Sequence, residues 1–498
     1  MADQIIGGLT TLLEPANFVF MFVGVAIGIV FGSLPGLTAT LGVAVMLTFT
    51  FGMAPVPAVM LLMGVYAGGI YGGAISAILI NTPGTPSSAA TVLDGYALTR
   101  QGRAGEALRI ATFATAFGGI LSALVLLFGA PQLARVALEF GPAEFFALAL
   151  FGLAVISGVS GGSLLKGLLM GILGLLISTV GLDPVGGLPR LTFGMDNLQG
   201  GVELIPALVG LFAIAELMRR APGAHLGAQR FETADTPFPF TRAFRYTRTL
   251  VKSSAIGTFI GAIPGAGPGI ASFLSYNEAR RSSKNKEKFG KGAREGVAAS
   301  EAGNNSATSA TLIPLLTLGI PGDTVTAVLL GALALQGLRP GPELFVDHAD
   351  IVYAIMLGLI IIQVMLYVQG RIAARLFARV ATVPPNLLIP VLIVLMFVGA
   401  YSVNNTVFDT RVMMVFGLVG YIAHRFGFPV VPMLLGIVLG PIAETGFRQA
   451  LLQSGGDPGV FFTRPLSLTF ITLAVLLFVA PLIAQGVSRL RQRDRVST

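Results

Sequence analysis

The sequence contains no cysteine and no tryptophan, and only three histidines among its 498 residues. The absence of cysteine excludes disulfide bonds and thiolate metal sites. The histidines at 225, 348 and 424 are far apart in the sequence and form no H-E-x-x-H zinc motif. A Walker lysine motif is also missing, which argues against direct coupling to ATP. These absences leave few options for an enzyme that depends on a metal or a nucleotide.

Charge is scarce as well, because only 11% of the residues are charged while 54% are hydrophobic. No aspartate, glutamate, lysine, arginine or histidine occurs between Glu14 and Asp94. Such a composition indicates a protein embedded in a lipid bilayer. The net charge of +8 is concentrated in a few loops, which is more typical of cytoplasmic loops than of nucleic-acid binding, so we expect no nucleic-acid partner. The N-terminus lacks a basic region and a cleavage site, which predicts no removable signal peptide.

Apolar stretches recur along the whole chain and predict an all-α polytopic membrane protein with about a dozen crossings. Several stretches, such as 307–318 and 325–335, are shorter than the ~20 residues that a full crossing needs. These short stretches predict half-helices or re-entrant segments.

Two unusual motifs occur twice. GSLPGLT at 32–38 is matched by GAIPGAG at 261–267, and ILINTPGTPSSAATVL at 78–93 is matched by LTLGIPGDTVTAVLLG at 316–331. Each copy places Pro-Gly inside an apolar run, where a helix must stop. A helix break within a membrane is tolerated only where the backbone is buried in protein or lines a cavity. Paired breaks in two halves therefore predict the binding site of a transporter.

The repeat extends beyond these motifs, since LTRQG at 98–102 matches LALQG at 333–337. Loops at matching positions of the two halves carry opposite net charge: where one is basic, the other is acidic. This pattern favours two repeats of inverted topology. One observation resists strict inversion. The basic segment at 219–252 and the basic C-terminal tail both look cytoplasmic, whereas strictly inverted halves would end on opposite sides of the membrane. An extra crossing in the second half would reconcile the two. We predict this division: a first transmembrane half at 1–218, a basic cytoplasmic linker at 219–252, a second transmembrane half at 253–488 and a basic cytoplasmic tail at 489–498.

Two basic loops flank the segment Ser253–Asn277. Residues 219–252 and 280–294 each hold seven lysines and arginines, so both loops should be cytoplasmic. The segment is too short to cross twice, which predicts a re-entrant hairpin with IPGAGPG at its tip. The alternative is one ordinary crossing with one basic loop on the other side.

Long runs of the sequence resemble the large membrane subunit of tripartite tricarboxylate transporters. They include GSLPGLTATLG, YGGAISAILINTPGTPSSAATVLDGYALTRQGRAGEAL, GAIPGAGPGIASF and EGVAASEAGNNSATSATLIPLLTLGIPGDT. The resemblance implies a bacterial inner (cytoplasmic) membrane protein that works with a small membrane subunit and a periplasmic solute-binding protein. It also implies uptake of an organic carboxylate coupled to a cation, with Na⁺ the expected ion and no other cofactor, and an elevator-like fold with two hairpins.

The candidate site residues lie at the breaks, where helix N-termini can stabilise a carboxylate. For the substrate we predict Pro35, Gly36, Thr38, Asn81, Thr82, Pro83, Gly84, Thr85, Ser87, Ser88, Pro264, Gly265, Gly267, Pro321, Gly322 and Thr324. For a Na⁺ site, which favours oxygen ligands, we predict Asn304, Asn305, Ser306, Ser309 and Asp323. The competing interpretation is that these small polar residues only pack helices together.

Four charged residues need separate interpretation. Asp323 either binds the cation or caps the helix that starts at Thr324, and the sequence does not decide. For Glu301 we favour a solvated place at the cytoplasmic end of a helix over an intramembrane site. For Lys166 and Arg411 we favour snorkelling at helix ends over attraction of an anion.

The alternative functions are a single-component carboxylate/cation symporter and a channel, with an intramembrane enzyme ranked behind both. A channel would need a continuous polar pore, whereas polarity here is concentrated at the two breaks.

Overall fold

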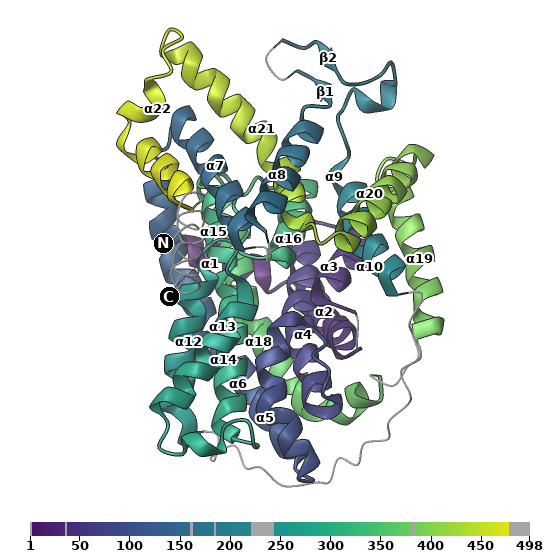
Figure 1. Cartoon of the computed structure of the whole chain (residues 1–498), viewed down its shortest axis with the longest axis vertical. Helices are drawn as coiled ribbons and strands as arrows, with labels where there is room; N and C mark the ends of the chain where they lie inside the picture. The colour runs from purple at the N-terminus through teal and green to yellow at the C-terminus, as the bar shows by residue number, and fades with distance from the viewer. Residues whose placement is uncertain are drawn as a thin grey trace, which may run out of the picture. The chain divides into compact units, whose positions relative to one another are not determined.

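The computed structural model describes residues 2–34, 37–159, 163–183, 186–220, 244–380 and 385–477. Within these ranges the chain is almost entirely helical, apart from one two-stranded antiparallel sheet (Figure 1). Among the described residues, six helices are long and apolar enough to cross a membrane, and further apolar helices are shorter. The predicted all-α polytopic class is therefore confirmed, while the count of about a dozen crossings stays a prediction.

The chain divides into two compact units, each built from both sequence halves. Unit 1 comprises residues 1–138 and 205–421, and unit 2 comprises residues 139–204 and 422–498. The first part of unit 1 contains α1 (Ala2–Leu12), α2 (Pro15–Ser33), α3 (Ala39–Leu47), η1 (Thr48–Thr50), α4 (Pro55–Ile80), η2 (Pro86–Ser88), α5 (Ala89–Arg100) and α6 (Ala104–Ala137). This spatial division differs from the sequence halves, which stay a prediction.

The rest of unit 1 comes mainly from the second half. It contains α9 (Leu204–Leu208), η4 (Val209–Ile214), α10 (Ala215–Arg220), η5 (Phe244–Tyr246), α12 (Thr247–Gly261), α13 (Gly267–Ser282), η6 (Lys286–Lys288), α14 (Arg294–Ala310), α15 (Leu312–Leu318), α16 (Thr324–Leu335), α17 (Leu344–Asp347), α18 (Ala349–Val380), α19 (Pro385–Ser402) and α20 (Val407–Arg425). Most of the predicted linker, residues 221–243, lies outside the described residues, as does the predicted tail.

Glycines bring α2 and α4 into backbone contact. They recur every fourth residue on both helices, at 24, 28 and 32 on α2 and at 64, 68 and 72 on α4. A Cβ atom added to Gly28 would lie 2.3 Å from the Val65 carbonyl oxygen, and one added to Gly68 would lie 2.4 Å from the Val25 carbonyl oxygen. Only glycine permits such an approach, which is a common way to pack transmembrane helices. This glycine seam holds α2 against α4, the helix that leads into the first break.

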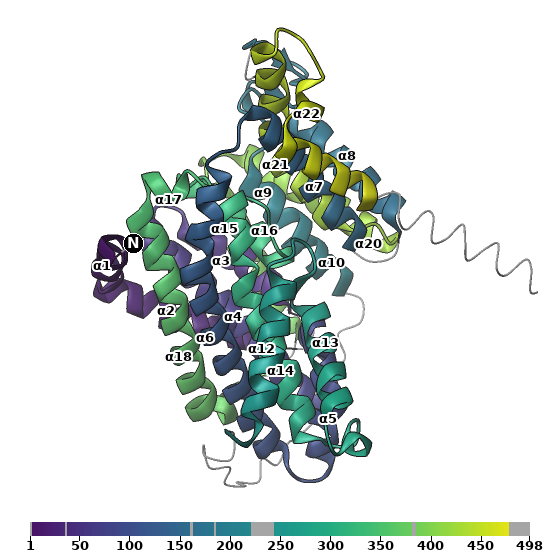
Figure 2. The same ribbon diagram turned by 90° about the vertical axis from the view of Figure 1, so that its left-hand side faces the viewer.

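Helix α14 lies at the centre of a second group of closely packed helices, with α6, α12 and α13 around it (Figure 2). A Cβ atom on Gly118 of α6 would lie 2.3 Å from the Ala302 carbonyl oxygen, and one on Gly257 of α12 would lie 2.3 Å from the Gly303 carbonyl oxygen. Every residue of α14 from Gly296 to Ala310 is buried. The polar run that α14 carries is therefore enclosed by protein.

Helices α12 and α13 form an antiparallel hairpin, and its tip is the IPGAG motif. At the open end Lys252 contacts Glu278, so the two ends of the segment lie side by side. Hydrogen bonds from Arg281 and Lys252 lower the pKa of Glu278 to about 2, which keeps this carboxylate ionised. The helical hairpin that the sequence predicts is present. Its entry into the membrane from the cytoplasm stays a prediction.

Cysteine labelling tests that topology. We expect single cysteines at Lys252 and Lys284 to react with an impermeant thiol reagent only from the cytoplasmic side, because both lie at the open, basic end of the hairpin. The natural chain contains no cysteine and gives the background. Labelling of one position from the periplasm and the other from the cytoplasm would make this segment an ordinary crossing.

Two glutamines link the halves reciprocally. Gln101, after α5, donates from Nε2 to the Lys291 carbonyl oxygen at 2.8 Å, just before α14. Gln336, after α16, donates from Nε2 to the Thr50 carbonyl oxygen at 3.0 Å, just before α4. The end of α5 in the first half thus contacts the turn before α14 in the second half. In the same way, the end of α16 in the second half contacts the turn before α4 in the first half. The glutamines belong to the matching LTRQG and LALQG motifs.

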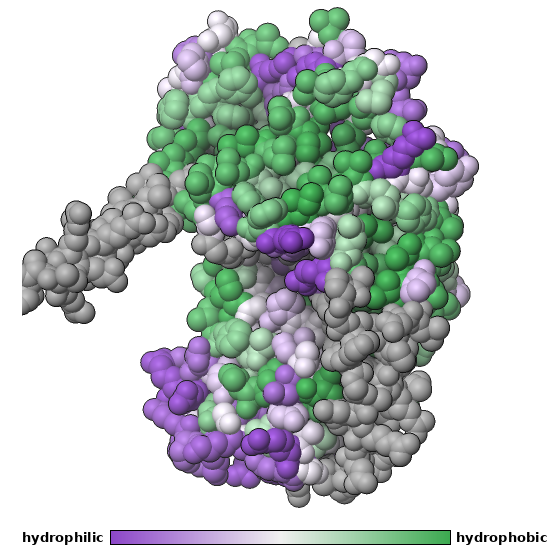
Figure 3. Space-filling view, turned by 45° about the vertical axis from the view of Figure 1, so that its right-hand side comes forward, coloured by the Kyte–Doolittle hydropathy of each residue, from purple (hydrophilic) through white to green (hydrophobic). Residues whose placement is uncertain are grey.

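Polar residues gather at one end of unit 1. Figure 3 shows one large hydrophilic area at the lower left, besides smaller hydrophilic patches elsewhere on the same face, and Figure 1 places the α13–α14 turn at this lower end. The exposed side chains there include Lys284, Lys286, Lys288 and Lys291. This end is the one that the positive-inside rule assigns to the cytoplasm.

Unit 2 contains α7 (Pro142–Val159), α8 (Leu164–Ser178), β1 (Gly181–Leu182), β2 (Pro189–Arg190), η3 (Asp196–Leu198), α21 (Val430–Gln453), α22 (Val460–Thr463) and a last helix at 465–477. Strand β1 pairs antiparallel with β2, Gly181 opposite Arg190.

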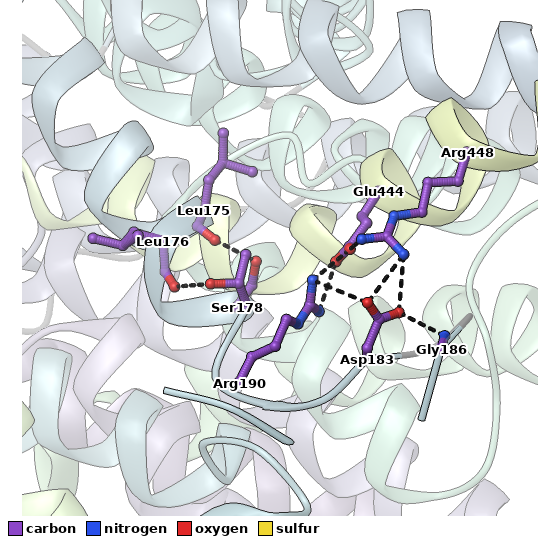
Figure 4. A network of polar contacts seen from close by, with 9 residues as sticks. Leu175, Leu176, Ser178, Asp183, Gly186, Arg190, Glu444 and Arg448 are labelled. Carbon is purple, nitrogen blue, oxygen red and sulfur yellow. Dashed lines mark hydrogen bonds and ion pairs between the residues drawn. The ribbon is translucent and has the colours of Figure 1, made fainter. Parts of the chain in front are cut away.

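Two ion pairs connect this β-hairpin to α21 (Figure 4). Arg190 contacts both carboxylate oxygens of Glu444, at 2.7 and 3.1 Å. Arg448 Nη1 lies 3.0 Å from each carboxylate oxygen of Asp183. Such bidentate pairs fix geometry.

Candidate functional site

The two helix breaks share one backbone pattern. Helix α4 ends at Ile80, and Asn81 adopts the left-handed conformation (φ 58°) before Pro83-Gly84. Helix α15 ends at Leu318, and Gly319 is left-handed (φ 69°) before Pro321-Gly322. A left-handed residue ends a helix, and the proline two positions later prevents it from continuing. The predicted breaks are therefore present in both halves, with the same spacing.

Each break packs against a glycine of the other repeated motif in its own half, GSLPGLT (32–38) or GAIPGAG (261–267). In the second half Gly265 donates its backbone N–H to the Gly322 carbonyl oxygen at 2.9 Å. In the first half a Cβ atom added to Gly84 would lie 1.9 Å from the Gly32 carbonyl oxygen. Backbone can approach backbone this closely only through glycine. The glycine at position 84 is thus explained by close approach.

Contacts also join the first half to the second at these points. Thr40 Oγ1 of α3 lies 3.1 Å from Thr324 Oγ1, so α3 meets the helix start at the second break. Tyr66 of α4 donates its hydroxyl to Asp323 Oδ2 at 2.6 Å. Conversely, Gly269 of the second hairpin packs beside Ser87 of the first break, where an added Cβ would lie 3.9 Å from the Ser87 Cα. The repeated motifs, far apart in sequence, form one region of unit 1.

The predicted substrate residues differ in exposure within this region. Thr85, Ser87 and Ser88 are buried, and Thr85 Oγ1 lies 3.0 Å from the hydroxyl oxygen of each serine. Asn81, Thr82 and Thr324 are exposed. The remaining described members are buried or half-buried: Thr38, Pro83, Gly84, Pro264, Gly265, Gly267, Pro321 and Gly322. Pro35 and Gly36 lie outside the described residues.

Asp323 begins α16 with a capping box. Its Oδ1 accepts from the Thr326 backbone N–H at 2.8 Å and from the Thr326 hydroxyl at 2.7 Å, while the Asp323 N–H donates to Thr326 Oγ1. Oδ2 accepts the Tyr66 hydroxyl. Both carboxylate oxygens therefore have partners, which favours the capping role. Ser88, at the matching start of α5, makes no side-chain cap.

The predicted cation ligands on α14 fall into two groups. Ser306 donates to the Ala302 carbonyl oxygen at 2.7 Å, and Ser309 donates to the Gly119 carbonyl oxygen at 3.2 Å. Asn304 and Asn305 are fully buried, and no amide atom of either side chain has a hydrogen-bond partner among the described residues. An unpaired buried amide is costly and points to a missing ligand.

Glu301 corrects one expectation, because it is fully buried rather than solvated at a helix end. Thr91 of α5 and Thr115 of α6 donate hydroxyl hydrogen bonds to its carboxylate. The sequence places it only seven residues after Arg294, and that spacing suggested a surface position. The cause of burial is tertiary, since α5, α6 and α14 enclose it. Sequence reasoning also missed Tyr66, which looks like any other aromatic residue in an apolar run.

Lys166 has a local structural role in unit 2. Its Nζ donates to the Phe426 carbonyl oxygen at 2.6 Å and lies 5.0 Å from the centre of the Phe428 ring. These contacts agree with a lysine at a helix end better than with one that attracts an anion.

Comparisons with known proteins identify the family. A family model described as "Tripartite tricarboxylate transporter TctA family" matches residues 18–435, which contain both hairpins and both breaks. The chain belongs to this family. Two similar proteins from Agrobacterium vitis are both described as uncharacterized. The one in the TAR-I ttuC' 3' region is 39% identical over 492 residues, 98% of this chain and 97% of its own length. The one in the TAR-II ttuC' 3' region is 37% identical over 240 residues, 48% of this chain and 98% of its own length.

No solved structure matches the chain significantly. Membership of the tripartite tricarboxylate transporter family, together with the apolar helices, identifies the protein as a multi-pass membrane subunit of a transporter. Within the part of the chain that the structure describes, no group of three or more histidine, aspartate or glutamate side chains could hold a metal ion.

Proposed function

We propose that this chain is the permease subunit of a binding-protein-dependent secondary transporter in the bacterial inner membrane. It takes up tricarboxylates or related organic carboxylates together with Na⁺. Its partners are a small membrane subunit and a periplasmic solute-binding protein. One observation carries the proposal: two helix breaks with the same backbone pattern lie in one region of unit 1, where the repeated glycine motifs and α3 contact them.

The first break is the better place for a carboxylate of the solute. At the second break, Asp323 already supplies a carboxylate to the N-terminus of α16. At the first break, the N-terminus of α5 has no side-chain cap, and the hydroxyls of Thr85, Ser87 and Ser88 cluster beside it. A helix N-terminus with nearby hydroxyl donors stabilises an anion without a fixed ion pair, so the anion can also leave. In this proposal the carboxylate of the solute interacts with the N-terminus of α5 as the carboxylate of Asp323 interacts with the N-terminus of α16.

For the coupling cation we retain the oxygen-rich run of α14. Of the five predicted residues, Asn304 and Asn305 have unpaired side chains, whereas Ser306, Ser309 and Asp323 already have partners. Amide oxygens suit a hard cation such as sodium. The two asparagines are therefore the primary ligands in this proposal.

Inverted repeats and elevator-like movement belong to the same proposal. The reciprocal contacts of Gln101 and Gln336 support a two-fold relation between the halves, because each links the helix after one break to the loop before the other broken helix. A two-fold relation between the halves produces such an exchange. The inversion itself is proposed from the opposite charge bias of matching loops. The elevator-like movement follows from the family resemblance.

Transport in proteoliposomes tests the function. We expect the chain, reconstituted with its two partners, to accumulate members of a panel of labelled di- and tricarboxylates when an inward sodium gradient is imposed. Replacing sodium by choline on both sides is the control and should stop accumulation. Accumulation that persists in choline would exclude sodium coupling. Uptake by the chain alone would indicate a single-component symporter, and passive flux without accumulation would indicate a channel.

A further inference from the structure

Glu301 is a buried carboxylate with no basic partner. Its side chain is fully enclosed, and among the described residues no lysine, arginine or histidine forms an ion pair with it. The acidic groups on the adjoining helices are already satisfied. Glu106 of α6 pairs with Arg103 and Arg294, and Asp94 of α5 accepts from the backbone N–H groups of residues 292 and 293. An ionised carboxylate is costly in such a place, so either a proton or a bound cation has to neutralise Glu301.

Neutral oxygens surround this carboxylate on three helices. Thr115 of α6 donates to Oε2 at 3.0 Å, Thr91 of α5 donates to Oε1, and Thr91 Oγ1 lies 3.0 Å from Ser300 Oγ. These two bonds use only part of the acceptor capacity of a carboxylate. One turn further along α14, Asn305 is four residues from Glu301 and therefore lies on the same helix face. Its amide oxygen is fully buried and has no partner among the described residues.

We propose that Glu301 and Asn305, together with the hydroxyl oxygens of Thr91 and Thr115, bind a monovalent metal cation of the sodium class. One negative charge among neutral oxygens matches a single positive charge. A divalent ion would ordinarily be held by more carboxylates than this one. The site refines the cation binding proposed above, and it depends on the proposed function only for the role of the cation in transport.

The location of this site gives the cation a structural role. Thr91 belongs to α5, the helix that starts directly after the first break. Glu301 belongs to α14, the helix that leads through α15 to the second break. A cation bound between them joins the first break to the second half. Binding of the ion and ordering of the uncapped α5 N-terminus are then linked, and each should strengthen the other.

Sodium binding to the purified full chain tests this site without any solute. Thermal unfolding and ²²Na⁺ binding are measured while NaCl replaces choline chloride at constant ionic strength. We expect saturable binding by the wild type. The half-saturating sodium concentration should rise at least about tenfold in Glu301→Gln, because removing a charged ligand costs about 1.5–3 kcal/mol. Thr115→Val, which removes one neutral oxygen and keeps the shape, should raise it by a factor of about three or more.

Glu106→Gln is the matched control. It changes a carboxyl of α6 that is also nearly buried but has arginine partners, and its sodium affinity should stay within about twofold of the wild type. Three results would overturn the site: no saturable sodium binding by the wild type, unchanged affinity in both Glu301→Gln and Thr115→Val, or proton binding that depends on Glu301 while sodium binding does not. If Glu301→Gln does not fold, the sodium affinity of Thr115→Val tests the site alone: an unchanged affinity would overturn it. Failure of carboxylate uptake with sodium binding intact would contradict the proposed function and leave this site standing.

Discussion

Gly68→Ala should prevent stable folding of the transporter, although it adds a single methyl group. The new carbon would lie 2.4 Å from the Val25 carbonyl oxygen and 3.0 Å from the Ile29 nitrogen, both backbone atoms of α2. Neither atom can move aside as a side-chain end can, so α2 and α4 would have to separate along the glycine seam. Overpacking typically costs about 1–3 kcal/mol, and we expect a cost at the upper end of that range because only backbone can move here. We expect a large loss of monodisperse protein after detergent extraction and a lower unfolding temperature in the remainder.

Gly129→Ala provides the comparison. Gly129 lies in the middle of α6, and an added Cβ would come no closer to a neighbour than 4.0 Å, from Val125 Cγ1. Yield and unfolding temperature should match the wild type, with a slight gain from the better helix propensity of alanine. Wild-type behaviour of Gly68→Ala would mean that the two helices are not in backbone contact.

Asp323→Ala should lower transport by a factor of ten to a hundred or more and destabilise the second break. The substitution removes the N-terminal cap of α16, worth about 0.5–2 kcal/mol. It also leaves the buried Tyr66 hydroxyl without this acceptor, which costs about 1–3 kcal/mol. Initial rates of carboxylate uptake and thermal unfolding of the same preparation measure the two effects.

Asp323→Asn separates capping from cation binding. Asparagine retains an oxygen for the Thr326 backbone N–H and caps helices as well as aspartate does. We therefore expect the half-saturating sodium concentration of transport to stay within about threefold of the wild type. A large rise in that concentration, with normal membrane insertion, would make Asp323 a cation ligand and shift the site away from Glu301.

Local rules predicted the helix breaks and the hairpin because their signals are local. Proline two residues after Asn81 or Gly319 stops a helix whatever surrounds it, and the basic loops on both sides of Ser253–Asn277 already implied a segment that returns. The glycines of the α2–α4 seam could be counted in the sequence. Which helix they would face could not be deduced.

Tertiary contacts explain what the sequence left open. Asp323 was equally compatible with a cap and a ligand until Tyr66, 257 positions away, was seen to occupy its second oxygen. Glu301 was misplaced because its distance from the basic loop is short in sequence, whereas its environment is made by Thr91 and Thr115 of the other half. Spacing along a chain carries no information about such partners.

The reciprocal glutamine contacts bear on the order of biosynthesis. At about 5–20 residues per second, a ribosome needs on the order of ten seconds or more to make the second half after the first. During that interval the amide of Gln101 and the carbonyl of Thr50 lack the partners they have in the finished protein. The face of α6 around Gly118 likewise lacks α14. A chain that stops between the halves therefore leaves the Thr50 carbonyl and the α6 face around Gly118 without the second-half residues that cover them in the finished protein.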